Sequence, residues 1–116
     1  MSKRILFAED DRDTRELLTS IAQLHGHEVV AVPDGVELLL KAEKEKFDVI
    51  ITDLMMKDLT GASASAILKL QGNVTPVIAL TALRAEDMEL MKDRFTRIFY
   101  KPCNIGEILD YIDSIK

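Results

Sequence analysis

The feature that most constrains the fold is an alternation of short, branched apolar runs with stretches of helical periodicity. The apolar runs cover residues 4–8, 28–32, 47–52, 76–80 and 98–100. Between them, apolar residues recur every three or four positions, as on one face of a helix. Strands that alternate with helices form a parallel sheet covered on both faces. The sequence therefore predicts an α/β fold, a flavodoxin-like doubly wound (βα)5 three-layer sandwich with strand order 2-1-3-4-5.

Five helices are expected between and after these strands. The first runs from about residue 11 to 25 and is expected to turn Leu17, Leu18, Ile21 and Leu24 inward. The second follows the cap-like sequence at residues 34–37, and the third follows Gly61. The fourth, over about 85–94, carries the thinnest apolar stripe, and the fifth begins after Asn104.

Size and charge limit the class of protein. With 116 residues the chain is long enough for one domain, 1–116, with a substantial core. The net charge of −5, with no cluster of Lys or Arg, argues against nucleic acid as a partner. No apolar stretch is long enough to span a membrane, and the first strand starts too early to leave room for a signal peptide. The single cysteine, Cys103, cannot form an internal disulfide, which suits a cytoplasmic location.

Polar residues follow four of the predicted strands: Glu9-Asp10, Asp53, Thr81 and Lys101. Each alone has an ordinary explanation as a helix-start acid, a turn residue or a surface lysine. Parallel strands, however, bring their carboxyl ends to one edge of the sheet, so we expect these side chains together in one crevice. Three carboxylates there repel one another unless a cation joins them, and oxygen ligands alone favour Mg²⁺. With the Lys101 ammonium and the Thr81 hydroxyl, the set has the parts needed to place a phosphoryl group on Asp53.

Over its whole length the chain resembles the receiver domain of response regulators. The matching positions are Glu9-Asp10, Asp53 with Gly61 eight residues later, Thr81-Ala82 and Lys101-Pro102. The resemblance implies that Asp53 takes a phosphoryl group from the phosphohistidine of a histidine kinase, or from a small phosphodonor, and that this switches partner binding. Thr81, Ala82 and Lys101 would complete the phosphoryl site, and the Lys101–Pro102 bond is expected to be cis. Such a domain promotes its own phosphorylation and dephosphorylation but is not a conventional enzyme.

The same resemblance implies a set of magnesium ligands. Asp10, Asp53 and the backbone carbonyl of Met55 would bind Mg²⁺, and Glu9 would reach it through a water molecule. Counting along the chain leaves Asp11 outside this set, at the start of the first helix.

Several positions depart from the family pattern. They are Lys57 in place of a proline, Ile98 in place of an aromatic residue, the approach to the fifth strand at 94–97, and Cys103 in place of a phenylalanine. All lie where the family reads out its signal, so the output route stays open. In addition, the family's side chains that border the path of the hydrolytic water are here the bulky apolar Met55 and Leu83.

Other readings remain to be weighed. A flavin or nucleotide site would need a Gly- or Ser-rich loop after the first strand, where this chain is acidic. A haloacid-dehalogenase-type phosphatase would need a second Asp at position 55, which is Met. A receiver-like interaction module that works without phosphorylation would have no need of the full polar set. The expected partner is a sensor histidine kinase or a histidine phosphotransfer protein, while the downstream effector stays open. The end at Lys116 fits a stand-alone regulator, a relay intermediate or a domain of a longer protein.

Overall fold

The protein forms one five-stranded parallel sheet in a computed structural model that describes residues 2–56, 59–102 and 104–115. The strands are β1 (Arg4–Ala8), β2 (Glu28–Val32), β3 (Val49–Asp53), β4 (Val77–Thr81) and β5 (Arg97–Tyr100). They lie in the order β2-β1-β3-β4-β5, so the predicted fold class and strand order are confirmed.

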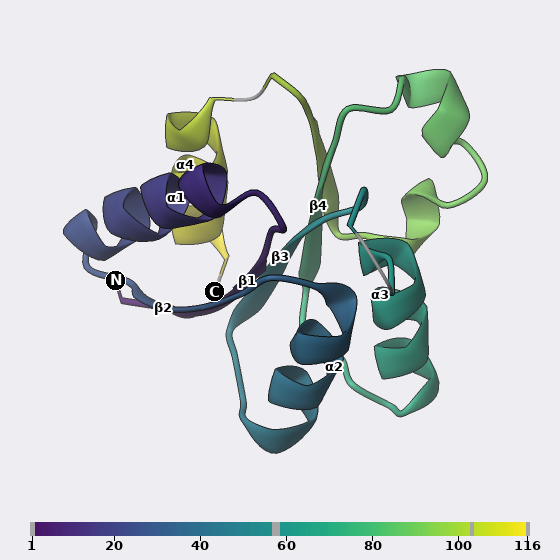
Figure 1. Cartoon of the computed structure of the whole chain (residues 1–116), viewed down its shortest axis with the longest axis horizontal. Coiled ribbons are helices and arrows are strands. Elements are labelled where there is room, and N and C mark those ends of the chain that lie inside the picture. Colours follow the sequence, from purple (N-terminus) through teal and green to yellow (C-terminus); the bar gives the residue numbers. More distant parts are fainter. Residues whose placement is uncertain (1, 57–58, 103, 116) are drawn as a thin grey trace.

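Within the described residues four α-helices cover the sheet: α1 (Arg12–Leu24), α2 (Gly35–Lys44), α3 (Gly61–Leu70) and α4 (Ile105–Ser114). Figure 1 shows α1 and α4 on one face of the sheet and α2 and α3 on the other. The molecule is therefore a three-layer sandwich in which helices hide both faces of the sheet.

The core divides into two halves because successive strand residues point to opposite faces. Residues such as Phe7 and Ile51 pack in the half that includes side chains of α1 and α4. Their neighbours Leu6 and Ile50 pack in the half that includes side chains of α2 and α3. All five residues of β3 are buried, as expected for a central strand covered on both sides.

Side-chain caps fix where the helices begin. Asp11 accepts the backbone N–H of Thr14 at the start of α1, and Asp34 accepts that of Glu37 at the start of α2. The predicted position of Asp11 at a helix start is confirmed, and its carboxylate therefore has a structural role.

The prediction for the inner face of α1 was only partly right. The helix buries Leu18 and Ala22, whereas Leu17 stays 56% exposed and Leu24 stays 85% exposed. The small side chain of Ala22 lets the helix approach the sheet through a narrow stripe. Leu17 and Leu24 lie outside that stripe and remain available to solvent.

The predicted helix over 85–94 is wrong. The structure has two short 3-10 turns there, η1 (Ala85–Met88) and η2 (Lys92–Arg94). The local backbone hydrogen bonds join residues three apart, as from the N–H of Asp87 to the carbonyl of Arg84. Only Met88 of this stretch is fully buried, and the ion pairs around it are on the surface, so no apolar face stabilises a regular α-helix.

Three remaining expectations concern single positions and the membrane. The Lys101–Pro102 bond is cis, as expected. Lys57 and Cys103 lie outside the described residues. Within the described ranges no helix has the length and apolar character needed to cross a bilayer.

Candidate functional site

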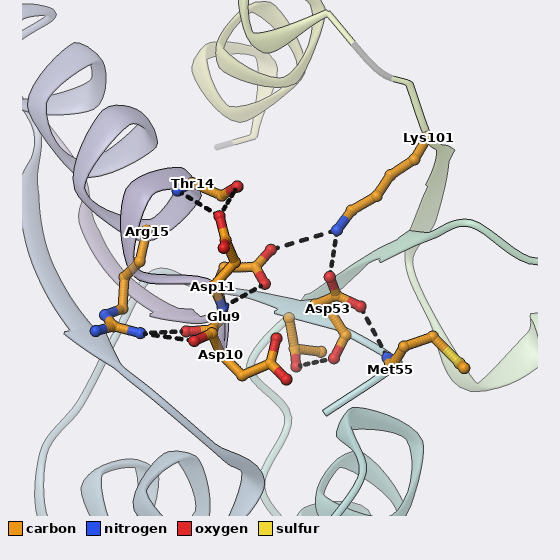
Figure 2. A network of polar contacts seen from close by, with 9 residues as sticks. Glu9, Asp10, Asp11, Thr14, Arg15, Asp53, Met55 and Lys101 are labelled. Atoms are coloured by element: carbon orange, nitrogen blue, oxygen red, sulfur yellow. Dashed lines mark hydrogen bonds and ion pairs between the residues drawn. The ribbon is translucent and has the colours of Figure 1, made fainter. Parts of the chain in front are cut away.

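The candidate site lies at the carboxyl ends of the central strands. Asp53 is the last residue of β3 and Thr81 the last residue of β4, while Glu9 follows β1 and Lys101 follows β5. The parallel order brings these ends to one edge, where β1 and β3 are neighbours. Figure 2 shows the Glu9 and Asp53 carboxylates converging on the Lys101 ammonium, while the Asp11 carboxylate turns to Thr14.

Asp53 is a buried carboxylate with both oxygens engaged. Only 3% of the residue is exposed. Its Oδ1 accepts the backbone N–H of Met55 at 2.8 Å, and its Oδ2 accepts a hydrogen bond from the Lys101 ammonium. A charge is held here at the end of an apolar strand because a cation and a backbone donor compensate for its lost hydration.

Glu9 shares the same ammonium and is even less exposed. Its Oε1 lies 3.3 Å from Lys101 Nζ, and its Oε2 accepts the backbone N–H of Asp11 at 3.1 Å. Burial raises the pKa of Glu9 to about 7, and the charge of Asp53 acts in the same direction. For Lys101, burial lowers the pKa, but the hydrogen bond and charge of Asp53 outweigh it, so the net pKa is raised. When Glu9 is ionised, one ammonium between two buried carboxylates leaves an excess of negative charge that a further cation would relieve.

Asp10 lies on the solvent side of this group. Its side chain is exposed, and the backbone around it is held by Arg15 of α1, whose guanidinium donates to the carbonyl of Glu9 at 2.7 Å. The acidic loop is therefore fixed from the helix that follows it. The contact of Arg15 with this loop was not predicted from the sequence.

Thr81 and Ala82 border the same edge from β4. Thr81 is fully buried, and its Oγ1 accepts the backbone N–H of Leu83 at 3.0 Å, while Ala82 is exposed. The Thr81 carbonyl also accepts the backbone N–H of Lys101 at 2.7 Å, which ties the ends of β4 and β5 together. Since the Thr81 hydroxyl accepts from Leu83, its own proton can still be donated.

Only some of the predicted site residues are in direct contact with one another. The structure joins Glu9, Asp53 and Lys101 by direct ion pairs. Asp10, Thr81 and Ala82 lie on the same edge, but among the described residues no hydrogen bond links the Asp10 or Thr81 side chain to Asp53.

Comparison with known proteins decides the family. The family model for the response regulator receiver domain matches residues 5–113. The protein belongs to this family.

Two relatives illustrate the sequence match of this receiver domain. It is 31% identical over 114 residues to the response regulator protein FleR of Pseudomonas aeruginosa, covering 97% of this chain and 24% of that protein. It is 37% identical over 82 residues to the alkaline phosphatase synthesis transcriptional regulatory protein PhoP of Bacillus subtilis, covering 71% of this chain and 34% of that one. The receiver domain thus spans a quarter to a third of the length of these relatives.

Solved structures agree with this assignment. The receiver domain of a Francisella response regulator superposes with a TM-score of 0.92 at 30% identity, covering 97% of this chain and 95% of that one. The chemotaxis response regulator CheY4 of Vibrio cholerae gives 0.90 at 29% identity over the full length of both chains. The response regulator TrrA of Thermotoga maritima, solved in complex with Mg²⁺ and BeF, gives 0.89 at 25% identity, covering 98% of this chain and 99% of that one. The family is one of phospho-acceptor signalling domains, and the alternative of a module that works without phosphorylation is not favoured.

The receiver domain's donor set suits a hard cation. The candidate ligands are carboxylate and carbonyl oxygens, which Mg²⁺ prefers, and the excess negative charge around Glu9 and Asp53 favours a divalent ion. Within residues 2–56, 59–102 and 104–115, however, no three Asp, Glu, His or Cys side chains converge as a ready-made cluster. A bound ion would therefore depend on backbone carbonyl and water oxygens as well as side chains, which is typical of Mg²⁺.

Proposed function

We propose that Asp53 is the phospho-acceptor of this receiver domain. The observation that carries the proposal is a carboxylate only 3% exposed, at the end of β3, in an ion pair with Lys101. The Met55 N–H fixes one oxygen of this group, and Glu9 places a second carboxylate on the same ammonium. A nucleophile held in one orientation beside a cation is what transfer of a phosphoryl group requires.

The proposed step balances in atoms and charge. A carboxylate oxygen of Asp53 forms a bond to phosphorus while the bond from phosphorus to a histidine nitrogen breaks. The imidazole nitrogen keeps the electron pair and takes a proton from solvent. The Lys101 ammonium, which already binds Asp53 Oδ2, lies where the transferred oxygens gather negative charge, so it stabilises the transition state. The Thr81 hydroxyl supplies a further donor to the product phosphoryl group.

The proposed magnesium ligands are Asp10, Asp53 and the backbone carbonyl of Met55, with Glu9 reaching the ion through water. When bound, the ion would neutralise charge on the phosphoryl oxygens. The protein's own part is to hold the acidic loop, through Arg15, opposite the end of β3.

The proposed phosphodonor is a protein with a phosphohistidine, such as a sensor kinase or a histidine phosphotransfer protein. A mostly apolar hollow of about 520 Å³ adjoins Lys101, and Leu17, Pro102 and Ile105 are among its lining residues. A protein partner could bury this surface while presenting its histidine to Asp53, which a small phosphodonor would not do. The proposed location of the domain is the cytoplasm, where such a partner would meet it. In this view the domain promotes its own modification without being a conventional enzyme.

Chemical mapping tests the acceptor directly. The protein is incubated with acetyl phosphate and Mg²⁺ and then reduced with borohydride, which converts an aspartyl phosphate to homoserine. Fragmentation of the peptides by mass spectrometry should place homoserine at position 53. Homoserine at another Asp, with Asp53 intact, would overturn the proposal.

We expect the phosphorylated state to be long-lived compared with that of rapidly responding receivers. Met55 is 59% exposed beside Asp53, and Leu83 is half-buried next to the Thr81 hydroxyl. Neither side chain can hydrogen-bond a water for in-line attack. Met55→Asn adds a polar group there and should speed loss of phosphate roughly tenfold. The measurement is the decay of phosphoprotein after the donor is removed.

The matched control for that prediction is Leu70→Asn, which makes a similar change at an exposed position at the end of α3. It should decay like the wild type. A wild type that loses phosphate as fast as the quickest receivers would contradict the expectation.

We also expect the signal to leave the site through residues 83–95. The Thr81 hydroxyl accepts a hydrogen bond from the Leu83 N–H. A movement of Thr81 toward a phosphoryl group therefore displaces Leu83, the first residue of this segment. The segment has only 3-10 turns, and its buried side chains are Met88 and, at its end, Phe95. Few core contacts therefore oppose its rearrangement. Ile98 is β-branched and half-buried, and it has no ring to swing between states.

NMR spectra with and without beryllofluoride, a phosphoryl mimic, measure this route. Amides of Leu83–Phe95 should shift more than the Ile98 methyl groups, while amides of β2, at the far edge of the sheet, serve as the control. Large Ile98 methyl shifts beside an unchanged 83–95 segment would show that isoleucine carries the signal instead.

A further inference from the structure

Thr52 makes a contact at the site that the phosphoryl chemistry above does not use. It is fully buried, directly before Asp53, and its hydroxyl donates to the Asp53 carbonyl oxygen at 2.9 Å. The last residue pair between β1 and β3 is Ala8 with Thr52. The Asp53 carbonyl therefore lies one residue beyond that ladder, where a side chain supplies the donor that a strand would otherwise provide.

The first residue of α3 packs closely against the Thr52 hydroxyl and the Asp53 carbonyl. A Cβ atom on Gly61 would lie 2.5 Å from the Asp53 carbonyl oxygen and 2.5 Å from Thr52 Oγ1. Only glycine allows such an approach, because any side chain would push the hydroxyl away from the carbonyl. The Asp53 peptide group is thus held between its neighbour's hydroxyl and the first residue of α3.

The contacts of the Asp53 carbonyl also influence the orientation of the Asp53 carboxylate. The Asp53 carboxylate binds the N–H of Met55, two residues further on, at 2.8 Å. The direction of that N–H depends on how the intervening peptide groups are turned, and the first of them carries the carbonyl that Thr52 binds. We infer that Thr52 is a positioning residue: through the Asp53 carbonyl it sets the orientation in which the Asp53 carboxylate meets Met55 and Lys101. Its effect on phosphorylation rests on the proposed function of Asp53.

A purely structural role predicts something different. A buried hydrogen bond contributes to stability wherever it lies, so losing the one from Thr52 would lower the melting temperature without moving the carboxylate. A positioning role predicts a change at the Met55 N–H and in the phosphorylation rate, in proportion to the loss of the hydroxyl. The Met55 N–H and the phosphorylation rate therefore distinguish the positioning role from a purely structural one.

The test uses three variants of the whole chain. Thr52→Val keeps the shape and removes the hydroxyl, whereas Thr52→Ser keeps the hydroxyl. Thr19→Val is the matched control, since among the described residues the buried Thr19 hydroxyl has no hydrogen-bond partner. The readouts are hydrogen exchange of the Met55 amide, the carbonyl ¹³C shift of Asp53, the melting temperature, and the phosphorylation rate with acetyl phosphate and Mg²⁺.

In Thr52→Val we expect faster Met55 exchange, a moved Asp53 carbonyl shift and roughly tenfold slower phosphorylation, since small misplacement of a reacting group is costly. Thr52→Ser and Thr19→Val should stay close to the wild type at Asp53 and Met55. A Thr52→Val protein that melts lower but matches the wild type at Met55 and in rate would overturn the inference. If the wild type itself takes no phosphate on Asp53, the proposed function fails, and the Met55 amide alone then decides: faster exchange in Thr52→Val upholds the positioning role, and unchanged exchange overturns it.

Discussion

Replacing Lys101 with Met should slow phosphorylation of Asp53 by about 10² to 10³, the usual cost of losing one donor that stabilises transition-state charge. The Lys101 ammonium binds both Asp53 Oδ2 and Glu9 Oε1. Methionine keeps the apolar part of the side chain but leaves two buried carboxylates with no cation between them. The negative charge of these carboxylates then opposes the approach of a negatively charged phosphodonor.

The measurement is the initial rate of mass gain with acetyl phosphate at saturating Mg²⁺. Lys69→Met, at an exposed position in the last turn of α3, is the matched control and should retain the wild-type rate. A melting curve separates loss of chemistry from loss of fold. A folded Lys101→Met protein within twofold of the wild-type rate would remove Lys101 from the site.

Replacing Asp10 with Asn should weaken Mg²⁺ binding by more than the roughly 10- to 100-fold loss typical of an outer-shell partner. The change removes one charged oxygen from the proposed ligand set and nearly preserves the shape of the side chain. Asp10 is exposed beside the buried Glu9, and Arg15 fixes the loop that carries both residues. Glu9→Gln should have a smaller effect, because the link from Glu9 to the ion is expected to run through water.

The chain contains no tryptophan, so calorimetry or amide chemical shifts should follow the Mg²⁺ titration. Asp13→Asn changes an exposed acid in the first turn of α1 and serves as the control. Unchanged affinity in Asp10→Asn would defeat the proposed ligand set, as would a larger loss in Glu9→Gln than in Asp10→Asn.

Much of the fold could be predicted because its determinants are local. Branched apolar runs mark the strands, and alternation with helices implies the parallel order that the structure has. The segment 85–94 could not be predicted from periodicity alone. Met88 and Met91 are spaced for a helix, but only Met88 is fully buried, and burial depends on contacts distant in sequence. For the same reason the exposure of Leu17 was missed.

Some features of the site could likewise be predicted from the sequence, and others could not. Asp53 and Lys101 could be placed at one edge because strand ends share that edge, and the structure joins them in an ion pair. Thr52 gave no sequence signal, since a β-branched residue inside a strand is ordinary. Its hydrogen bond to the Asp53 carbonyl depends on where β1 ends and how closely α3 approaches, which only the folded chain shows.

The central claim is that Asp53 carries the phosphoryl group, and intact mass after incubation with acetyl phosphate and Mg²⁺ tests it most directly. The wild type should gain one phosphoryl group. Asp53→Asn should gain none, while Asp11→Asn, which alters the neighbouring acid that caps α1, should gain one. An Asp53→Asn protein labelled to the wild-type extent would contradict the claim and would place the acceptor elsewhere in the chain.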